Sequence, residues 1–82
     1  ARHRGMVKFF MLDPGDTRGI RSAAGMKVLV TLNSGDTLQA RIDGVAGSDI
    51  LLKVDRNVGG GVVRFIDEVP LSTIRSIKVF EE

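Results

Sequence analysis

Residues 25–53, GMKVLVTLNSGDTLQARIDGVAGSDILLK, decide the fold of this chain. Apolar and polar side chains alternate in two successive runs, and alternation with a period of two predicts half-buried β-strands. The apolar positions are Val28, Val30 and Leu32 in the first run and Leu38, Ala40 and Ile42 in the second. An Asn-Ser-Gly turn joins the runs into a hairpin, and a third apolar run at 50–52 follows almost at once. This order predicts a small, tightly bent β-barrel.

The chain beyond this stretch continues the β-pattern. Turn signals recur at short, regular intervals, which is typical of all-β sandwiches and barrels. We expect core strands at 26–33, 36–45, 48–57, 62–69 and 75–80. Gly44 and Gly47 lie where the second strand must bend into the third, and glycine lowers the cost of such curvature. The glycines at 59–61 predict a flexible hairpin tip, and Pro70 predicts the end of the fourth strand because it cannot donate a ladder hydrogen bond.

A basic segment precedes the predicted barrel. The apolar run at 6–12 ends in an Asp-Pro-Gly-Asp turn and predicts a short strand. Residues 13–25 show no clear period and predict a connector with room for one helical turn around 20–24. Cationic side chains in this segment suit either a phosphate-binding arm or a solvated leader; they are Arg2, Arg4, Lys8, Arg18 and Arg21. We therefore divide the chain into a basic N-terminal extension at 1–25 and a barrel at 26–82.

The barrel pattern resembles the Sm/LSm/Hfq superfamily. Residues that match its first motif are Gly25, Val28, Val30, Leu32, Gly35, Ala40, Ile42 and the run Ile50-Leu51-Leu52-Lys53. The stretch VPLSTIRSIKV at 69–79 looks like the second motif, in which a short turn carries Ile74 and a strand carries Ile77. The resemblance implies an all-β fold, a strongly bent five-stranded Sm-like (SH3-like) barrel, here with an extra N-terminal strand or short helix.

Length and composition limit the class of protein. A chain of 82 residues has room for one domain with a modest core. It has no cysteine, so neither a disulfide framework nor a thiolate metal site can form, which fits a cytoplasmic location. The net charge of +2 makes only a mild electrostatic case for nucleic acid. No apolar run approaches the roughly 18 residues that a membrane span needs, so we expect no membrane association.

The sequence offers little for catalysis. His3 is the only histidine, and tyrosine and tryptophan are absent as well as cysteine. Acid–base and nucleophilic chemistry need such groups in defined arrangements. The carboxylates of Asp36, Asp43 and Asp49 occupy turn and polar-face positions rather than the spacing of a metal-binding loop. We expect a protein that is not an enzyme and that uses no metal or cofactor.

The family resemblance implies RNA binding, but the positions of the usual uridine pocket do not match. The residues that align with the family's aspartate, stacking aromatic and asparagine are Ala46, Ser48 and Ile50, and its Arg-Gly pair aligns with Pro70-Leu71. Without those groups, base stacking and edge recognition are lost from that pocket. We expect RNA to bind a basic surface instead, and the candidate residues are Arg41, Lys53, Arg56, Arg64 and Arg75, with Ser48 and Asp49 as hydrogen-bonding groups. Surface ion pairing with Asp43, Asp55, Asp67 and Glu68 is an equally weighted interpretation of these cations.

The last predicted strand, 75–80, resembles an exposed edge that invites pairing with another chain. In Sm-like proteins the fourth strand pairs with the fifth strand of a neighbour, and the head-to-tail contact closes a ring of five to seven subunits. The resemblance implies the same homo-oligomer here, with an interface formed by Val63, Phe65, Ile77 and Val79. A second hypothesis, from a different class, is a structural or protein-interaction module that binds no nucleic acid.

Overall fold

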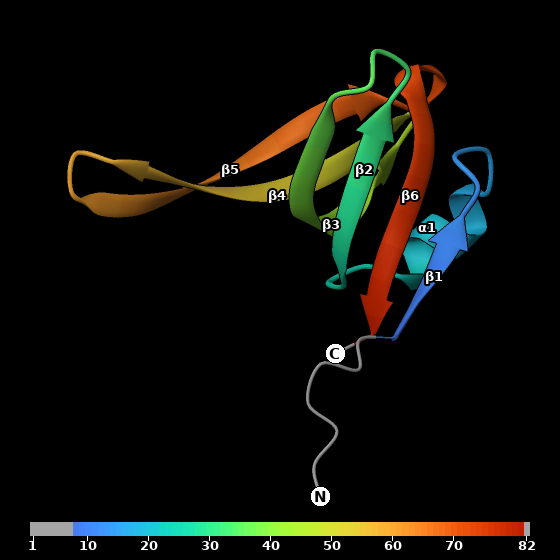
Figure 1. Cartoon of the computed structure of the whole chain (residues 1–82), viewed down its shortest axis with the longest axis horizontal. Coiled ribbons are helices and arrows are strands. Elements are labelled where there is room, and N and C mark those ends of the chain that lie inside the picture. Colours follow the sequence, from blue (N-terminus) through green and yellow to red (C-terminus); the bar gives the residue numbers. More distant parts are fainter. Residues whose placement is uncertain (1–7, 82) are drawn as a thin grey trace, which may run out of the picture.

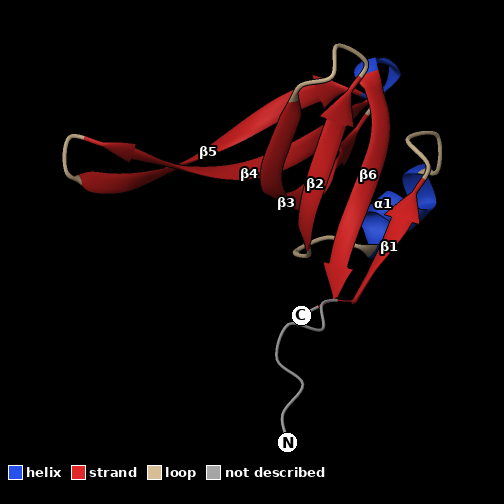
Figure 2. Ribbon diagram, in the orientation of Figure 1, coloured by secondary structure: helices blue, strands red, loops and turns tan. Residues whose placement is uncertain are grey.

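The computed structural model describes residues 8–81, which form one antiparallel sheet with a short helix against it (Figures 1 and 2). The elements are β1 (Lys8–Leu12), α1 (Thr17–Ser22), β2 (Lys27–Leu32), β3 (Thr37–Ala46), β4 (Asp49–Val58), β5 (Gly61–Pro70), the 3-10 turn η1 (Leu71–Thr73) and β6 (Ile74–Glu81). All five predicted core strands are present, so the all-β class is confirmed. The predicted strand at 6–12 is confirmed over 8–12, and residues 6 and 7 lie outside the described residues.

The strand order in the sheet is β1-β6-β2-β3-β4-β5. Residues 8–81 thus form an open sheet of six strands rather than a closed five-stranded barrel. The sheet bends at the predicted place, because the register of β3 against β4 shifts between Ile42 and Gly44. Gly47 lies in the turn that follows, with a φ of 61°, a left-handed conformation that favours glycine.

The core lies on one face of the sheet, where alternate residues of β2, β3, β4 and β6 are buried. Its members on these strands are Val28, Val30, Ala40, Ile42, Ile50, Leu52, Ile74, Ile77 and Val79. The helix α1 packs against this face with Ile20, which is fully buried. Asp16 caps the helix, since its carboxylate accepts a hydrogen bond from the Gly19 amide at 2.9 Å. The helical segment therefore begins earlier than the turn expected around 20–24.

The strand β1 changes the expected border of the sheet. It pairs with β6 along its whole length, from Lys8 opposite Glu81 to Leu12 opposite Ile77. The prediction that 75–80 forms an edge strand is therefore wrong, because β6 lies between β1 and β2. The turn after β1, in which Asp13 accepts a hydrogen bond from the Gly15 amide, directs the chain into α1. Among the described strands, the sheet ends at β1 on one side and β5 on the other.

The β4–β5 hairpin extends well beyond the rest of the sheet (Figure 1). Its two strands pair from Asp49 opposite Pro70 to Val58 opposite Gly61. Only the half nearest the other strands contributes to the core, since Ile50 and Leu52 are fully buried. The outer half is an arm, residues 54–66, that keeps large apolar side chains in solvent.

Candidate functional site

Three cations lie side by side across the middle of the sheet. Lys27 of β2 is directly opposite Arg41 of β3, and Arg41 is directly opposite Lys53 of β4. Residues opposite each other in a sheet share a face. Because the adjacent residues Val28 and Ala40 are buried, this face is the one turned away from the core. We call Lys27, Arg41 and Lys53 the cationic row.

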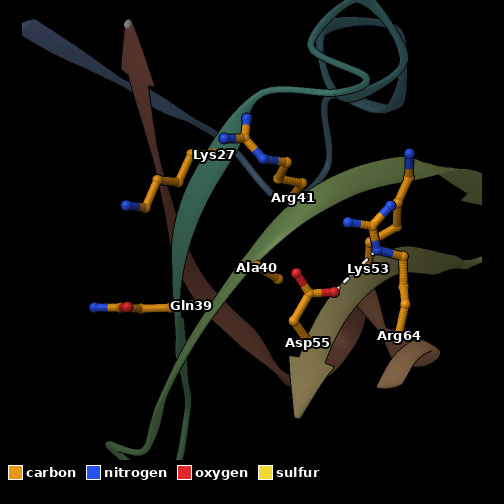
Figure 3. A pocket seen from close by; sticks show the side chains of 7 residues that line it. All are labelled: Lys27, Gln39, Ala40, Arg41, Lys53, Asp55 and Arg64. Atoms are coloured by element: carbon orange, nitrogen blue, oxygen red, sulfur yellow. Dashed lines mark hydrogen bonds and ion pairs between the residues drawn. The ribbon is translucent and has the colours of Figure 1, made fainter. Parts of the chain in front are cut away.

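A shallow hollow of about 250 Å³ lies along the cationic row. Its lining consists of Lys27, Gln39, Ala40, Arg41, Lys53, Asp55 and Arg64. Figure 3 shows the Asp55–Arg64 pair on one side of it and Lys27 with Gln39 on the other. Four cations and one carboxylate line the hollow, which gives its lining a net charge of +3.

Local bonds hold the cationic side chains in different ways. The Arg41 guanidinium donates a hydrogen bond from Nη1 to the carbonyl oxygen of Gly25 at 3.0 Å, which ties the middle of the row to the segment just before β2. Lys53 Nζ lies 3.7 Å from Asp43 Oδ1, with about a third of each side chain exposed. Lys27 forms no ion pair with the described residues. Lys27 is therefore the member of the row with most freedom to meet an anion.

Asp55 and Arg64 form the best-defined ion pair at the rim of the hollow. Arg64 Nε donates to Asp55 Oδ1 at 2.9 Å. The hydrogen bond from Arg64 lowers the pKa of the Asp55 carboxyl below its ordinary value, and the bond to Asp55 raises the pKa of Arg64. Both side chains are exposed, so a phosphate can compete with the carboxylate for the guanidinium.

The structure brings together some of the predicted binding residues and separates others. Arg41, Lys53 and Arg64 line the hollow, but Arg56 lies on the opposite face, where it contacts Asp67 at 3.1 Å. Arg75 donates to the backbone oxygen of Asn33 at 2.9 Å, in the turn after β2.

The two hydrogen-bonding candidates lie at the far end of β4. Ser48 is in the β3–β4 turn, where its carbonyl oxygen accepts a hydrogen bond from the Leu71 amide at 2.9 Å, and Asp49 is half-buried opposite Pro70. Three predicted cations form ion pairs, as the alternative interpretation expected; the pairs are Lys53–Asp43, Arg56–Asp67 and Arg64–Asp55.

Sequence reasoning missed Lys27 and the aromatic side chains beside it. Phe80 of β6 is directly opposite Lys27, and Phe9 of β1 is directly opposite Phe80, so both continue the cationic row toward the border of the sheet. Lys78 lies over the Phe9 ring, with Nζ 4.3 Å from the ring centroid. The alternation within 26–33 puts Lys27 on the outward face, but only the pairing of β6 with β1 and β2 places the two rings beside it.

The four residues predicted for an oligomer interface divide into two pairs. Val63 and Phe65 lie on the border strand β5, with 42% and 38% of their surface exposed. Ile77 and Val79 are fully buried in the core, because β1 and β2 flank β6 and the core face covers their side chains. In the described part of the chain, Val63 and Phe65 are therefore the accessible members of the predicted interface.

Residues 8–81 contain no group of three or more metal-binding side chains. They also contain no helix that is long and apolar enough to cross a membrane. Comparison of the sequence with models of known protein families and with curated proteins finds no match. The function must therefore be argued from the geometry of the sheet.

Proposed function

We propose that this chain is a non-enzymatic, Sm-like nucleic-acid-binding protein that holds single-stranded RNA on the outward face of its sheet. The observation that carries the proposal is the cationic row, in which three positive side chains from three adjacent strands lie directly opposite one another. Neighbouring strands are about 4.8 Å apart, so the row extends over roughly 10 Å. That length suits successive phosphates of one extended strand.

The aromatic end of the row supplies a second contact for RNA. Phe80 and Phe9 follow Lys27 in the same line across β6 and β1. A base that stacks on an aromatic side chain gains roughly 1–3 kcal/mol, with little regard to its identity. The proposed mode is therefore phosphate contact at the cationic row and weakly selective stacking beside it, in place of the family's uridine pocket.

A homo-oligomer belongs to the same proposal. A ring of five to seven Sm-like subunits would repeat the cationic row in every copy and strengthen binding to a long RNA through multivalency. A cytoplasmic location is part of the proposal as well.

A second candidate function is a protein-interaction module that binds no nucleic acid. It is favoured by the apolar side chains that the β4–β5 arm exposes, among them Val62, Val63, Phe65 and Ile66. Exposed apolar clusters of this kind are typical of protein contacts.

Titration of nitrogen-labelled protein with short oligo-U, oligo-A and mixed RNA, followed by NMR at low salt, tests the two candidates. RNA binding predicts that amide shifts concentrate at Lys27, Arg41, Lys53 and Phe80, with similar affinity for the three RNAs. Lys27→Glu should weaken binding strongly, and Arg18→Glu, an equal change of charge on α1, should not. If no RNA binds at low salt, the interaction module replaces the RNA-binding proposal.

A further inference from the structure

We infer that copies of this chain assemble edge to edge, with β1 of one copy paired antiparallel to β5 of the next. Each of these strands is paired on one side only within the described residues, β1 with β6 and β5 with β4. An unpaired edge presents free backbone amides and carbonyls that can pair with another strand. The two edges lie at opposite borders of the same open sheet, so neither can satisfy the other within one chain.

The distribution of exposed apolar side chains supports the use of these two edges. Of the large hydrophobic residues that are exposed among residues 8–81, all but Val58 belong to β1 or β5. They are Phe9, Phe10 and Met11 on β1, and Val62, Val63, Phe65 and Ile66 on β5. About half of the Phe9 surface, 51%, is in solvent. Pairing of the two edges would cover both groups together.

The direction of the strands fits a continuous sheet. All five pairings in the sheet are antiparallel, so β1 and β5, the first and sixth strands in its order, run in opposite directions. A second copy placed beside the first in the same orientation therefore brings its β1 antiparallel to β5. The added strand β1 is what makes the number of strands even.

One register between β1 and the neighbour's β5 keeps the core sides of the two sheets together and also pairs opposite charges. Phe10 is opposite the buried Val79, and Phe65 is two positions from Asp67, which is opposite the buried Leu52, so both aromatic rings are on the core side of the sheet. Pairing Phe10 with Phe65 of the neighbour keeps the two core sides together.

The same register brings complementary residues together at the flanking positions. It places Leu12 opposite Val63 and the ammonium of Lys8 opposite the carboxylate of Asp67. A shift of the register by two residues in one direction puts Phe10 opposite Asp67, and the opposite shift puts Lys8 opposite Phe65. Each shifted register therefore places an aromatic ring opposite a charged group. The occupant that fits both edges is thus a second copy of this chain, and this assembly does not depend on RNA binding.

Two single variants separate this contact from other modes of association. Phe9→Glu places the new carboxylate beside Lys78, and Val63→Glu places it opposite Arg56, so each charge has a partner within its own chain. At the proposed contact each charge would instead meet an apolar neighbour. Val58→Glu, on the inner strand of the same hairpin, is the matched control.

Light scattering and native mass spectrometry without nucleic acid give the outcome. The wild-type protein and Val58→Glu should form assemblies larger than the 8.9 kDa chain, and each edge variant alone should be monomeric. An equimolar mixture of Phe9→Glu and Val63→Glu should form a dimer, because one intact β1 edge and one intact β5 edge remain. A monomeric wild-type protein, a Phe9→Glu variant that still assembles, or a mixture that stays monomeric would each overturn the inference.

Cysteine cross-linking tests the register independently of these variants. The chain has no cysteine, so the double variant Phe10→Cys, Phe65→Cys introduces the only thiols. Side chains directly opposite each other have Cβ atoms about 4.5–5.5 Å apart, close enough for a disulfide under oxidation. Covalent oligomers should form with this pair and not with Phe10→Cys, Ile66→Cys, whose thiols lie on opposite faces. Equal cross-linking of both variants would refute the register.

Discussion

Removal of two cations from the cationic row should lower the salt dependence of RNA binding by a calculable amount. The variant is Lys27→Gln, Lys53→Gln, which leaves Arg41 as the only cation of the row. The apparent affinity for a single strand falls with salt concentration with a log–log slope of about −0.7 for each phosphate neutralised. Three cations in contact with three phosphates therefore predict a slope of about −2.1, and one remaining cation a slope of about −0.7. Arg64 lies outside the cationic row and is the same in both proteins, so it is left out of this estimate.

These slopes give a clear difference over an ordinary range of salt. Between 50 and 200 mM salt, the wild-type affinity should fall by roughly 18-fold and that of the double variant by roughly 3-fold, using the slope per phosphate above. Fluorescence anisotropy with a short labelled RNA, long enough to cover one row, measures both values. The lost Lys53–Asp43 pair is partly exposed and its atoms are 3.7 Å apart, so its loss should cost no more than about 1 kcal/mol of stability.

A matched control separates local contact from total charge. Arg18→Gln, Arg21→Gln makes the same change in net charge on α1, which packs on the core side of the sheet, away from the cationic row. This control should keep the wild-type slope. If both double variants lost the same amount of slope, RNA binding would depend only on the overall charge. If Lys27→Gln, Lys53→Gln kept the wild-type slope, RNA would bind elsewhere. Either result refutes the proposed site.

Two further predictions concern the fold and its response to pH. Ile20→Ala should lower the free energy of unfolding by about 2–4 kcal/mol in urea denaturation, since this fully buried side chain is the only buried residue of α1. The control Arg21→Ala changes an exposed residue and should lower it by less than about 0.5 kcal/mol. An equally small loss for Ile20→Ala would contradict its role as the anchor of the helix. The Asp55 carboxyl should titrate by NMR below its ordinary pKa, and Arg64→Gln should raise this pKa toward the ordinary value. Because the folded-state pKa is the lower one, the small stabilisation from this pair is present above the unfolded-state pKa and is lost as the pH falls through the folded-state value. An Asp55 pKa that does not change in Arg64→Gln would contradict the assigned hydrogen bond.

The candidate site shows how far local patterning reaches. Strand periodicity was enough to place Arg41 and Lys53 on outward faces, and both line the hollow. The same periodicity separates Arg56 from Lys53, because positions three apart on a strand point to opposite faces. Alternation alone was therefore enough to exclude Arg56 from the face that carries Lys53. Lys27 was missed although the short turn between β2 and β3 sets the register of that hairpin, and this register places Lys27 opposite Arg41.

The sequence by itself determined the β-strands, their turns and the buried face of the first hairpin, because these follow from alternation and turn chemistry within a few neighbouring residues. Only the tertiary structure decided that β1 pairs with β6, since Phe9 and Phe80 are far apart in the chain and no local pattern encodes which edge an extra strand will cover. That pairing buries Ile77 and Val79 within an inner strand and moves the border of the sheet to β1. It also brings the two phenylalanines to the end of the cationic row, because backbone pairing sets which side chains become neighbours across a sheet.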